Sequence, residues 1–98
     1  MFSLTFTEEA ALDIQEAALW YDMQSQKSGE RFYNELNRTL AFIENNPLQY
    51  QRISNNIRQA PLKNFPYSLF YYLIKDMVRV IACVHQARDI QRILKERT

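Results

Sequence analysis

Apolar and polar residues alternate at the start of the chain and then change to a helical spacing. Phe2, Leu4 and Phe6 stand between polar residues, and this period of two predicts a short strand with one buried face. Thr7 is placed to cap a following helix, whose two leading glutamates suit the positive end of the helix dipole. An apolar stripe then recurs at helical spacing to about Gln24. Its members are Ala10, Ile14, Ala17 and Tyr21.

A second apolar stripe predicts a second helix, which the polar segment SQKSGE separates from the first. Ser28 is the expected N-cap of this helix. The stripe consists of Phe32, Leu36, Leu40 and Ile43. The helix is expected to end in the sequence NNP, because Pro47 disfavours helical geometry at the residue before it. The short connection between the two stripes predicts an antiparallel helical hairpin.

Strand patterns dominate the second half of the chain. Residues 56–65 predict a strand in which Pro61 favours an edge position or a bulge. Residues 67–74 and 77–85 are dense in aromatic and β-branched residues and predict two longer strands. The polar pair Lys75-Asp76 between them predicts a tight hairpin turn.

A short helix is expected from Arg88 onward, because Ile90, Ile93 and Leu94 form an apolar stripe there. The predicted order is β-α-α-β-β-β followed by this C-terminal helix. It describes an α+β fold in which a mostly antiparallel sheet carries a helical hairpin on one face. The 98 residues suffice for one compact domain, 1–98, with one core.

The turn at residues 75–76 assigns the side chains of the two long strands to two faces. The face expected to pack against the helices holds Tyr67, Leu69, Tyr71, Leu73, Val78, Val80, Ala82 and Val84. The other face is mixed in polarity and holds Ser68, Phe70, Tyr72, Ile74, Met77, Arg79, Ile81, Cys83 and His85. Exposed aromatic residues on so small a domain are typical of a partner-binding surface. The alternative is that another element of the chain covers this face.

Charge is divided unevenly along the chain. Residues 1–51 hold three basic and eight acidic residues, a net charge of −5, whereas residues 52–98 hold nine basic and three acidic residues, a net charge of +6. The basic half predicts an anionic partner, either nucleic acid or an acidic, amphipathic protein segment. The alternative is an ordinary solvated surface.

The composition argues against several classes of protein. The start of the chain lacks a basic segment followed by an apolar one, so a secretory signal is not expected. No apolar run approaches the roughly 20 residues that cross a bilayer, so no membrane association is expected. Cys83 is the only cysteine, which leaves no disulfide framework and suits the reducing cytoplasm. With one cysteine and one histidine, the sequence predicts neither a metal site nor a cofactor.

Four segments in order resemble the RelE/ParE superfamily, the toxins of type II toxin–antitoxin systems that are often called plasmid stabilisation proteins. They are LTFTEEAALDIQEAALWY, GERFYNELNRTLAFIENNP, IRQAPLKNFPYSLFYYL and VRVIACVHQARD, and together they cover nearly the whole chain. The resemblance implies the α+β architecture described above. It also implies a cognate antitoxin that wraps the toxin with an extended or helical segment.

The superfamily acts in two ways. Its RelE-like branch cleaves messenger RNA in the ribosomal A site with a cluster of basic residues on the concave face of the sheet. Its ParE-like branch poisons DNA gyrase and has no known hydrolytic site. RelE-like toxins commonly carry an arginine on the strand that matches residues 67–74, but YSLFYYLI here has no charged residue. This departure favours the ParE-like branch.

The candidate site residues differ between these alternatives. If the chain is a ribonuclease, His85 is the candidate for proton transfer and Arg58 the candidate cation, with ribosome and mRNA as partners; the alternative for His85 is a structural role. If it is ParE-like, four residues near the C-terminus are expected to bind gyrase, or else form a solvated helix face. They are Arg88, Arg92, Lys95 and Arg97.

The antitoxin is expected on the mixed face of the two long strands, at Phe70, Tyr72, Arg79 and Ile81. A third possibility is a protein of the same fold that binds its partner without being toxic.

Overall fold

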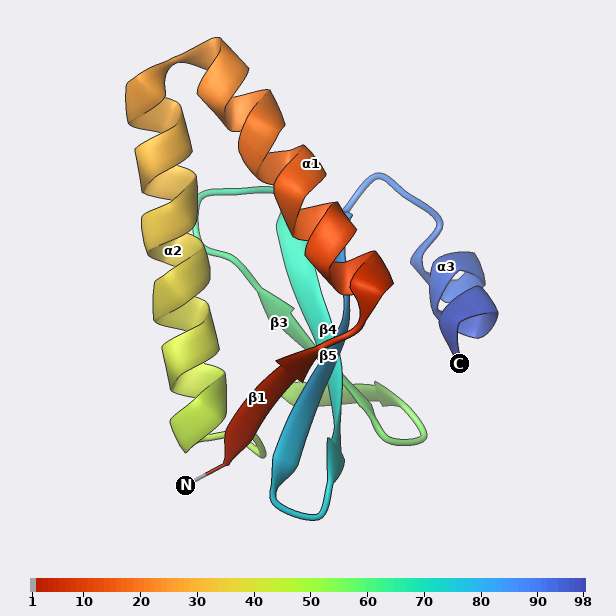
Figure 1. Cartoon of the computed structure of the whole chain (residues 1–98). Helices are drawn as coiled ribbons and strands as arrows, with labels where there is room; N and C mark the ends of the chain where they lie inside the picture. Colours follow the sequence, from red (N-terminus) through yellow and green to blue (C-terminus); the bar gives the residue numbers. More distant parts are fainter. Residues whose placement is uncertain (1) are drawn as a thin grey trace.

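The computed structural model describes residues 2–98, which form a helical hairpin, a five-stranded sheet and a short third helix (Figure 1). The elements are β1 (Ser3–Phe6), α1 (Glu8–Gln24), α2 (Gln26–Asn45), β2 (Gln51–Ser54), β3 (Ile57–Pro61), β4 (Tyr67–Ile74), β5 (Met77–His85) and α3 (Ile90–Arg97). The strand order in the sheet is β1-β5-β4-β3-β2. Only β1 and β5 pair in parallel within this sheet, so the predicted fold class is confirmed.

Local capping explains how the hairpin begins and turns. Thr7 caps α1 as predicted, and its hydroxyl accepts a hydrogen bond from the Ala10 N–H at 3.1 Å. The cap of α2 is Ser25 rather than the predicted Ser28, and Ser25 Oγ accepts from the Ser28 N–H at 3.0 Å. The N–H of Ser25 also donates to the Tyr21 carbonyl at 3.2 Å and closes α1. One residue therefore ends the first helix and starts the second.

The chain's single glycine lies where α1 and α2 approach each other. Gly29 is buried, and a Cβ built on it would lie 1.6 Å from Oδ1 of Asp22 and 3.2 Å from the Asp22 Cα. The missing side chain therefore permits the close approach of the two helices.

The edge of the sheet departs from the prediction. β2 was not predicted, because its four residues QRIS offer only one apolar side chain. β3 ends at Pro61, well before the predicted end at residue 65. Asn64, in the following turn, has φ 66°, a left-handed conformation that asparagine tolerates and that does not continue a strand.

A β-bulge interrupts the hairpin of β4 and β5. Ile74 lies opposite Met77 across the tight turn at residues 75–76, and the register holds as far as Tyr71 opposite Val80. Phe70, the residue before Tyr71, lies opposite Ala82, which leaves Ile81 as the extra residue of β5. Such an insertion reverses the alternation of side chains beyond it.

The bulge corrects the predicted facing of the end of β5. Cys83 packs in the core beneath the helices, whereas Ala82 and Val84 pack on the opposite face. His85 lies beside Tyr67, on the side of the helices. The predictions for these four residues of β5 are therefore wrong, because the alternation was extended through a bulge that the sequence does not signal.

Two cores lie on opposite faces of the sheet. The larger core joins the sheet to α1 and α2, and includes Phe32, Leu36, Ile43, Leu69 and Tyr71. The smaller core joins the sheet to α3 and consists of Ile57, Phe70, Ile81, Ala82, Val84 and Leu94. Phe70 is 0% exposed and Ile81 is 1% exposed, so the expectation of an open face is wrong at these two residues.

Candidate functional surfaces

The C-terminal helix α3 is fixed to the sheet by an apolar face and by an ion pair. Leu94 is buried against the sheet, with Ile90 and Ile93 beside it. At its end, Arg97 Nη2 donates to Oδ1 of Asp13 on α1 at 3.1 Å, and Arg97 Nη1 donates to the Ile81 carbonyl at 3.1 Å. The contact therefore joins α3 to both the first helix and the sheet.

Asp13 is the common acceptor in this contact. Its Oδ2 accepts a hydrogen bond from the backbone N–H of Cys83 at 3.0 Å as well as from Arg97. The hydrogen bond with Asp13 raises the pKa of the Arg97 guanidinium. Burial and the neighbouring Asp13 carboxylate raise the pKa of the Cys83 thiol to about 12, which keeps the thiol protonated.

The four predicted target-binding residues fall into two groups. Arg97 is largely buried and occupied within the chain, so the structure does not leave its guanidinium free for a target. Arg88, Arg92 and Lys95 are exposed. Arg92 lies 4.0 Å from Glu96 in an open pair, and no ion pair within residues 2–98 involves Arg88 or Lys95. Three of the four cations thus remain available on and beside α3.

The two residues of the ribonuclease alternative lie apart. His85 is opposite Tyr67 and Arg58 is opposite Tyr71, so the two positions are separated by β4 and by four residues along it. This separation is about 13 Å along the strand at ~3.3 Å per residue. Arg58 is also engaged elsewhere, because its Nη1 donates to the Tyr50 carbonyl at 2.7 Å. The structure therefore does not bring the two residues together.

His85 lies instead in a cavity of about 230 Å³ between α1, the end of β5 and the segment before α3. The imidazole packs edge-on against Tyr67, with ring centroids 5.1 Å apart, and its Nδ1 accepts from the Ala87 N–H at 3.0 Å. Trp20 and Arg88 line the same cavity. Sequence reasoning did not group these residues, because they come from distant segments that only the packing of α1 on β5 brings together.

The predicted antitoxin contacts also divide. Phe70 and Ile81 lie in the small core beneath α3. Tyr72 and Arg79 are partly exposed and lie opposite each other on β4 and β5. Among residues 2–98, Arg79 belongs to none of the ion pairs. The accessible part of the predicted surface is therefore this second pair.

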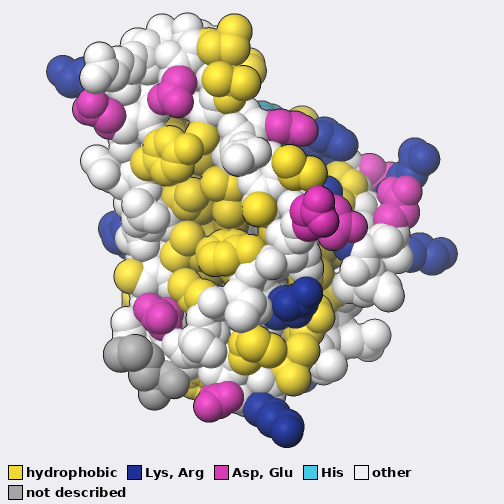
Figure 2. Space-filling model, in the orientation of Figure 1, with side chains coloured by type: hydrophobic (Ala, Val, Ile, Leu, Met, Phe, Trp, Pro, Cys, Tyr) yellow, Lys and Arg dark blue, Asp and Glu magenta, His cyan; other side chains and the backbone are white. Residues whose placement is uncertain are grey.

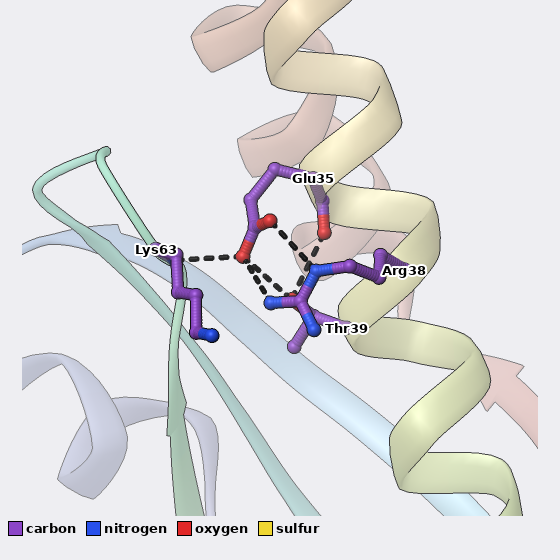
Figure 3. A network of polar contacts seen from close by, with 4 residues as sticks. All are labelled: Glu35, Arg38, Thr39 and Lys63. Atoms are coloured by element: carbon purple, nitrogen blue, oxygen red, sulfur yellow. Dashed lines mark hydrogen bonds and ion pairs between the residues drawn. The ribbon is translucent and has the colours of Figure 1, made fainter.

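A larger hollow lies between α2 and the turn after β3, and Figure 3 shows the Glu35 carboxylate at its wall with Arg38, Thr39 and Lys63. Glu35 accepts hydrogen bonds from Arg38 at 2.9 and 2.8 Å, from the Thr39 hydroxyl at 3.2 Å and from the Lys63 N–H at 2.7 Å. The bond from Arg38 is the main reason that the pKa of Glu35 is lowered. The network joins α2 to the turn after β3 and offsets part of the positive charge there.

Two other kinds of site are absent from the part of the chain that the structure describes. No cluster of three or more His, Cys, Asp or Glu within residues 2–98 has the proximity that a metal ion requires. No helix in the same range is long and apolar enough to cross a membrane.

Comparisons with known proteins agree with the geometry. A family described as the ParE toxin of the type II toxin–antitoxin system, parDE, matches residues 4–90. A solved structure titled "Chromosomal ParDE TA system from P. aeruginosa" superposes with a TM-score of 0.72 at 17% identity, covering 87% of this chain and 96% of that chain. At this identity the superposition supports the fold. A search of curated proteins finds no match.

Proposed function

Because this chain belongs to the ParE toxin family of type II toxin–antitoxin systems, we propose that it poisons DNA gyrase and that a cognate antitoxin neutralises it. The chain is a ParE-like toxin, since the family match spans residues 4–90. The target and the mode of neutralisation are the proposed steps. Since gyrase works in the cytoplasm, the toxin is expected to act there.

The chemistry of the sheet face opposite the hairpin supports gyrase over the ribosome. Cleavage of RNA needs cations around the phosphate and groups that move protons. On this face, β4 contributes Phe70 to a core that α3 covers, and β4 carries no charged residue. The covered part of this face therefore offers no group that could stabilise a phosphate, and Arg79 is the one arginine or lysine of β4 and β5. This observation carries the choice of the ParE-like mechanism.

The proposed contact with gyrase consists of Arg88, Arg92 and Lys95. These exposed cations suit an acidic protein surface or the DNA that gyrase holds. Arg97 acts as a positioning residue, because its bonds to Asp13 and to the Ile81 carbonyl hold the helix that presents the other cations.

The proposed antitoxin contact on the sheet consists of Tyr72 and Arg79, which an acidic, amphipathic segment would cover. Phe70 and Ile81 support this surface from beneath α3 rather than touching the partner. Because Arg79 belongs to none of the ion pairs described above, its contact with an acidic segment is expected to weaken as salt is added. Affinity that is indifferent to ionic strength would remove the electrostatic part of this proposal.

The test of the target uses the purified chain and gyrase in a DNA supercoiling and cleavage assay. Charge reversal at Arg88, Arg92 and Lys95 should abolish most of the inhibition, whereas reversal at the exposed cations Lys27 and Lys75 should not. In cells without antitoxin, the wild-type chain should cause filamentation and a DNA-damage response. Translation arrest with cut transcripts would contradict the proposal.

One observation favours the ribosome-dependent ribonuclease as the second candidate. His85, Tyr67 and Arg88 line a single cavity, and such side chains could move a proton and hold a phosphate. The distinguishing variant is His85→Gln, which keeps polarity and approximate size. It should leave a gyrase poison active, whereas it should lower the rate of a ribonuclease by on the order of 10²–10⁴. A chain without any effect on growth would instead be a non-toxic binding protein.

A further inference from the structure

The first helix exposes large apolar side chains on the face that is turned away from the sheet. Leu12 is 51% exposed, Leu19 60%, Trp20 55% and Met23 76%. We call these four residues the α1 seam. At about 100° per residue, Leu12, Leu19 and Met23 fall within about 40° of one another around the helix, with Trp20 beside them. They therefore form a continuous stripe rather than scattered exposed residues.

The seam is not required for the packing of α1 in this fold. The buried residues of α1 are the small Ala10, Ala17 and Ala18, which let the helix approach α2 and the sheet closely. The larger apolar side chains thus lie outside, in contrast to the usual arrangement of an amphipathic helix. A second helix packed on this stripe would bury them, because spacings of seven and four residues are those of helix-on-helix contacts.

The charges around the seam restrict what can cover it. The helix carries Glu8, Glu9, Asp13, Glu16 and Asp22 and no lysine or arginine. Only Asp13 takes part in an ion pair within residues 2–98. Figure 2 shows yellow hydrophobic and magenta acidic side chains interspersed over the face that α1 and α2 form. Glu16 lies between Leu12 and Leu19 in the stripe, so an occupant of the seam must face this carboxylate.

These charges argue against a second copy of the chain as the occupant. Two α1 helices packed on each other would bring carboxylates together with no cation between them, and like charges at a contact are unfavourable. A helix with lysine or arginine beside its own apolar stripe would satisfy both the seam and its acidic border.

We infer that the α1 seam binds a basic amphipathic helix of the cognate antitoxin. This inference rests on the proposed function, in which an antitoxin neutralises the toxin. It adds a second contact, in which a basic antitoxin helix meets the acidic seam, to the contact of an acidic antitoxin segment with Arg79. Because α3 packs on the other face of the sheet, the seam lies apart from Arg92 and Lys95, whereas Trp20 and the neighbouring Glu16 border the cavity that Arg88 also lines.

The test measures the affinity of the purified chain for the antitoxin encoded beside it. One variant, Leu19→Ser with Met23→Ser, removes the apolar stripe, and a second, Glu16→Lys, reverses the central charge. Each should weaken binding at least about tenfold, because buried apolar side chains and opposed charges each contribute that much at an interface. The matched controls are Leu48→Ser, at a side chain 64% exposed outside α1, and Glu30→Lys, at an exposed carboxylate of α2.

The outcomes separate this inference from the proposed function. Gyrase inhibition without antitoxin should be unchanged in the Leu19→Ser, Met23→Ser variant, because neither side chain lines the cavity that Arg88 borders. Unchanged antitoxin affinity in both variants overturns the seam but leaves the toxin mechanism intact. Sedimentation tests whether the seam is instead a surface for self-association. The inference is also overturned if the wild-type chain is a dimer, the Leu19→Ser, Met23→Ser variant is a monomer, and the antitoxin affinity is unchanged. A wild-type chain that binds no antitoxin overturns both proposals.

Discussion

Helices α1 and α3 pack on opposite faces of the sheet beside the same part of β5, but they differ in which apolar residues they bury. α3 buries Leu94 against the sheet and exposes Arg92 and Lys95, whereas α1 buries alanines and leaves Leu19 and Met23 exposed. α3 has eight residues, too short to be stable alone, so it depends on its contacts. α1 is held by the hairpin and by β5, and can leave one face free. The difference separates a helix that is positioned by the fold from one whose outer face is available to a partner.

The sharpest test of this comparison removes one leucine from each helix. Leu94→Ala should lower the free energy of unfolding by about 3 kcal/mol, because it leaves a cavity between α3 and the sheet. Leu19→Ala should change it by less than about 0.5 kcal/mol, since the side chain is 60% exposed and alanine favours helices. Urea denaturation of both variants measures the two values. Equal losses would show that α1 and α3 do not differ in this way.

A second test compares the two ion pairs of α3. Arg97→Ala should destabilise the protein by about 2 kcal/mol, because it leaves Asp13 without its partner in a largely buried position. Arg92→Ala should cost less than about 0.5 kcal/mol, since its pair with Glu96 is open to solvent. Hydrogen exchange should also rise at the amides of α3 in the first variant only. Protected α3 amides in Arg97→Ala would mean that the apolar contacts alone hold the helix.

The smallest expected effect concerns Glu35, which connects the hairpin to the sheet at a site remote from α3. Glu35→Gln should cost about 1 kcal/mol at neutral pH through its weakened hydrogen bonds. The pKa of Glu35 is lower in the folded protein than in the unfolded chain. The carboxylate therefore stabilises the fold fully at pH values above the pKa of the unfolded chain, and this stabilisation disappears as the pH falls through the pKa of the folded protein. The stability difference between wild type and variant should therefore shrink below about pH 4.5. If the stability difference between wild type and Glu35→Gln grows as the pH falls, the ionised carboxylate does not stabilise the fold.

The candidate surfaces were predictable only in part. The sequence identifies Arg92 and Lys95 as exposed cations, because their spacing relative to Ile93 and Leu94 places them off the apolar stripe. It gives no sign that Arg97, at the end of the same helix, contacts Asp13, which lies 84 residues earlier. The cavity around His85 was missed for the same reason, since Trp20 and Arg88 meet it only after α1 packs on β5.

The sequence by itself determined the elements whose signals are local. Period-two alternation, helical stripes, the Thr7 cap and the turn at Lys75-Asp76 depend on neighbours a few residues apart, so α1, α2, β4, β5 and α3 were predicted close to their observed bounds. The tertiary structure decided which face each residue of β5 presents beyond Ile81, because one inserted residue reverses the alternation. It also decided that α3 covers Phe70, since closure of a helix over a sheet depends on contacts between distant segments that no local pattern records.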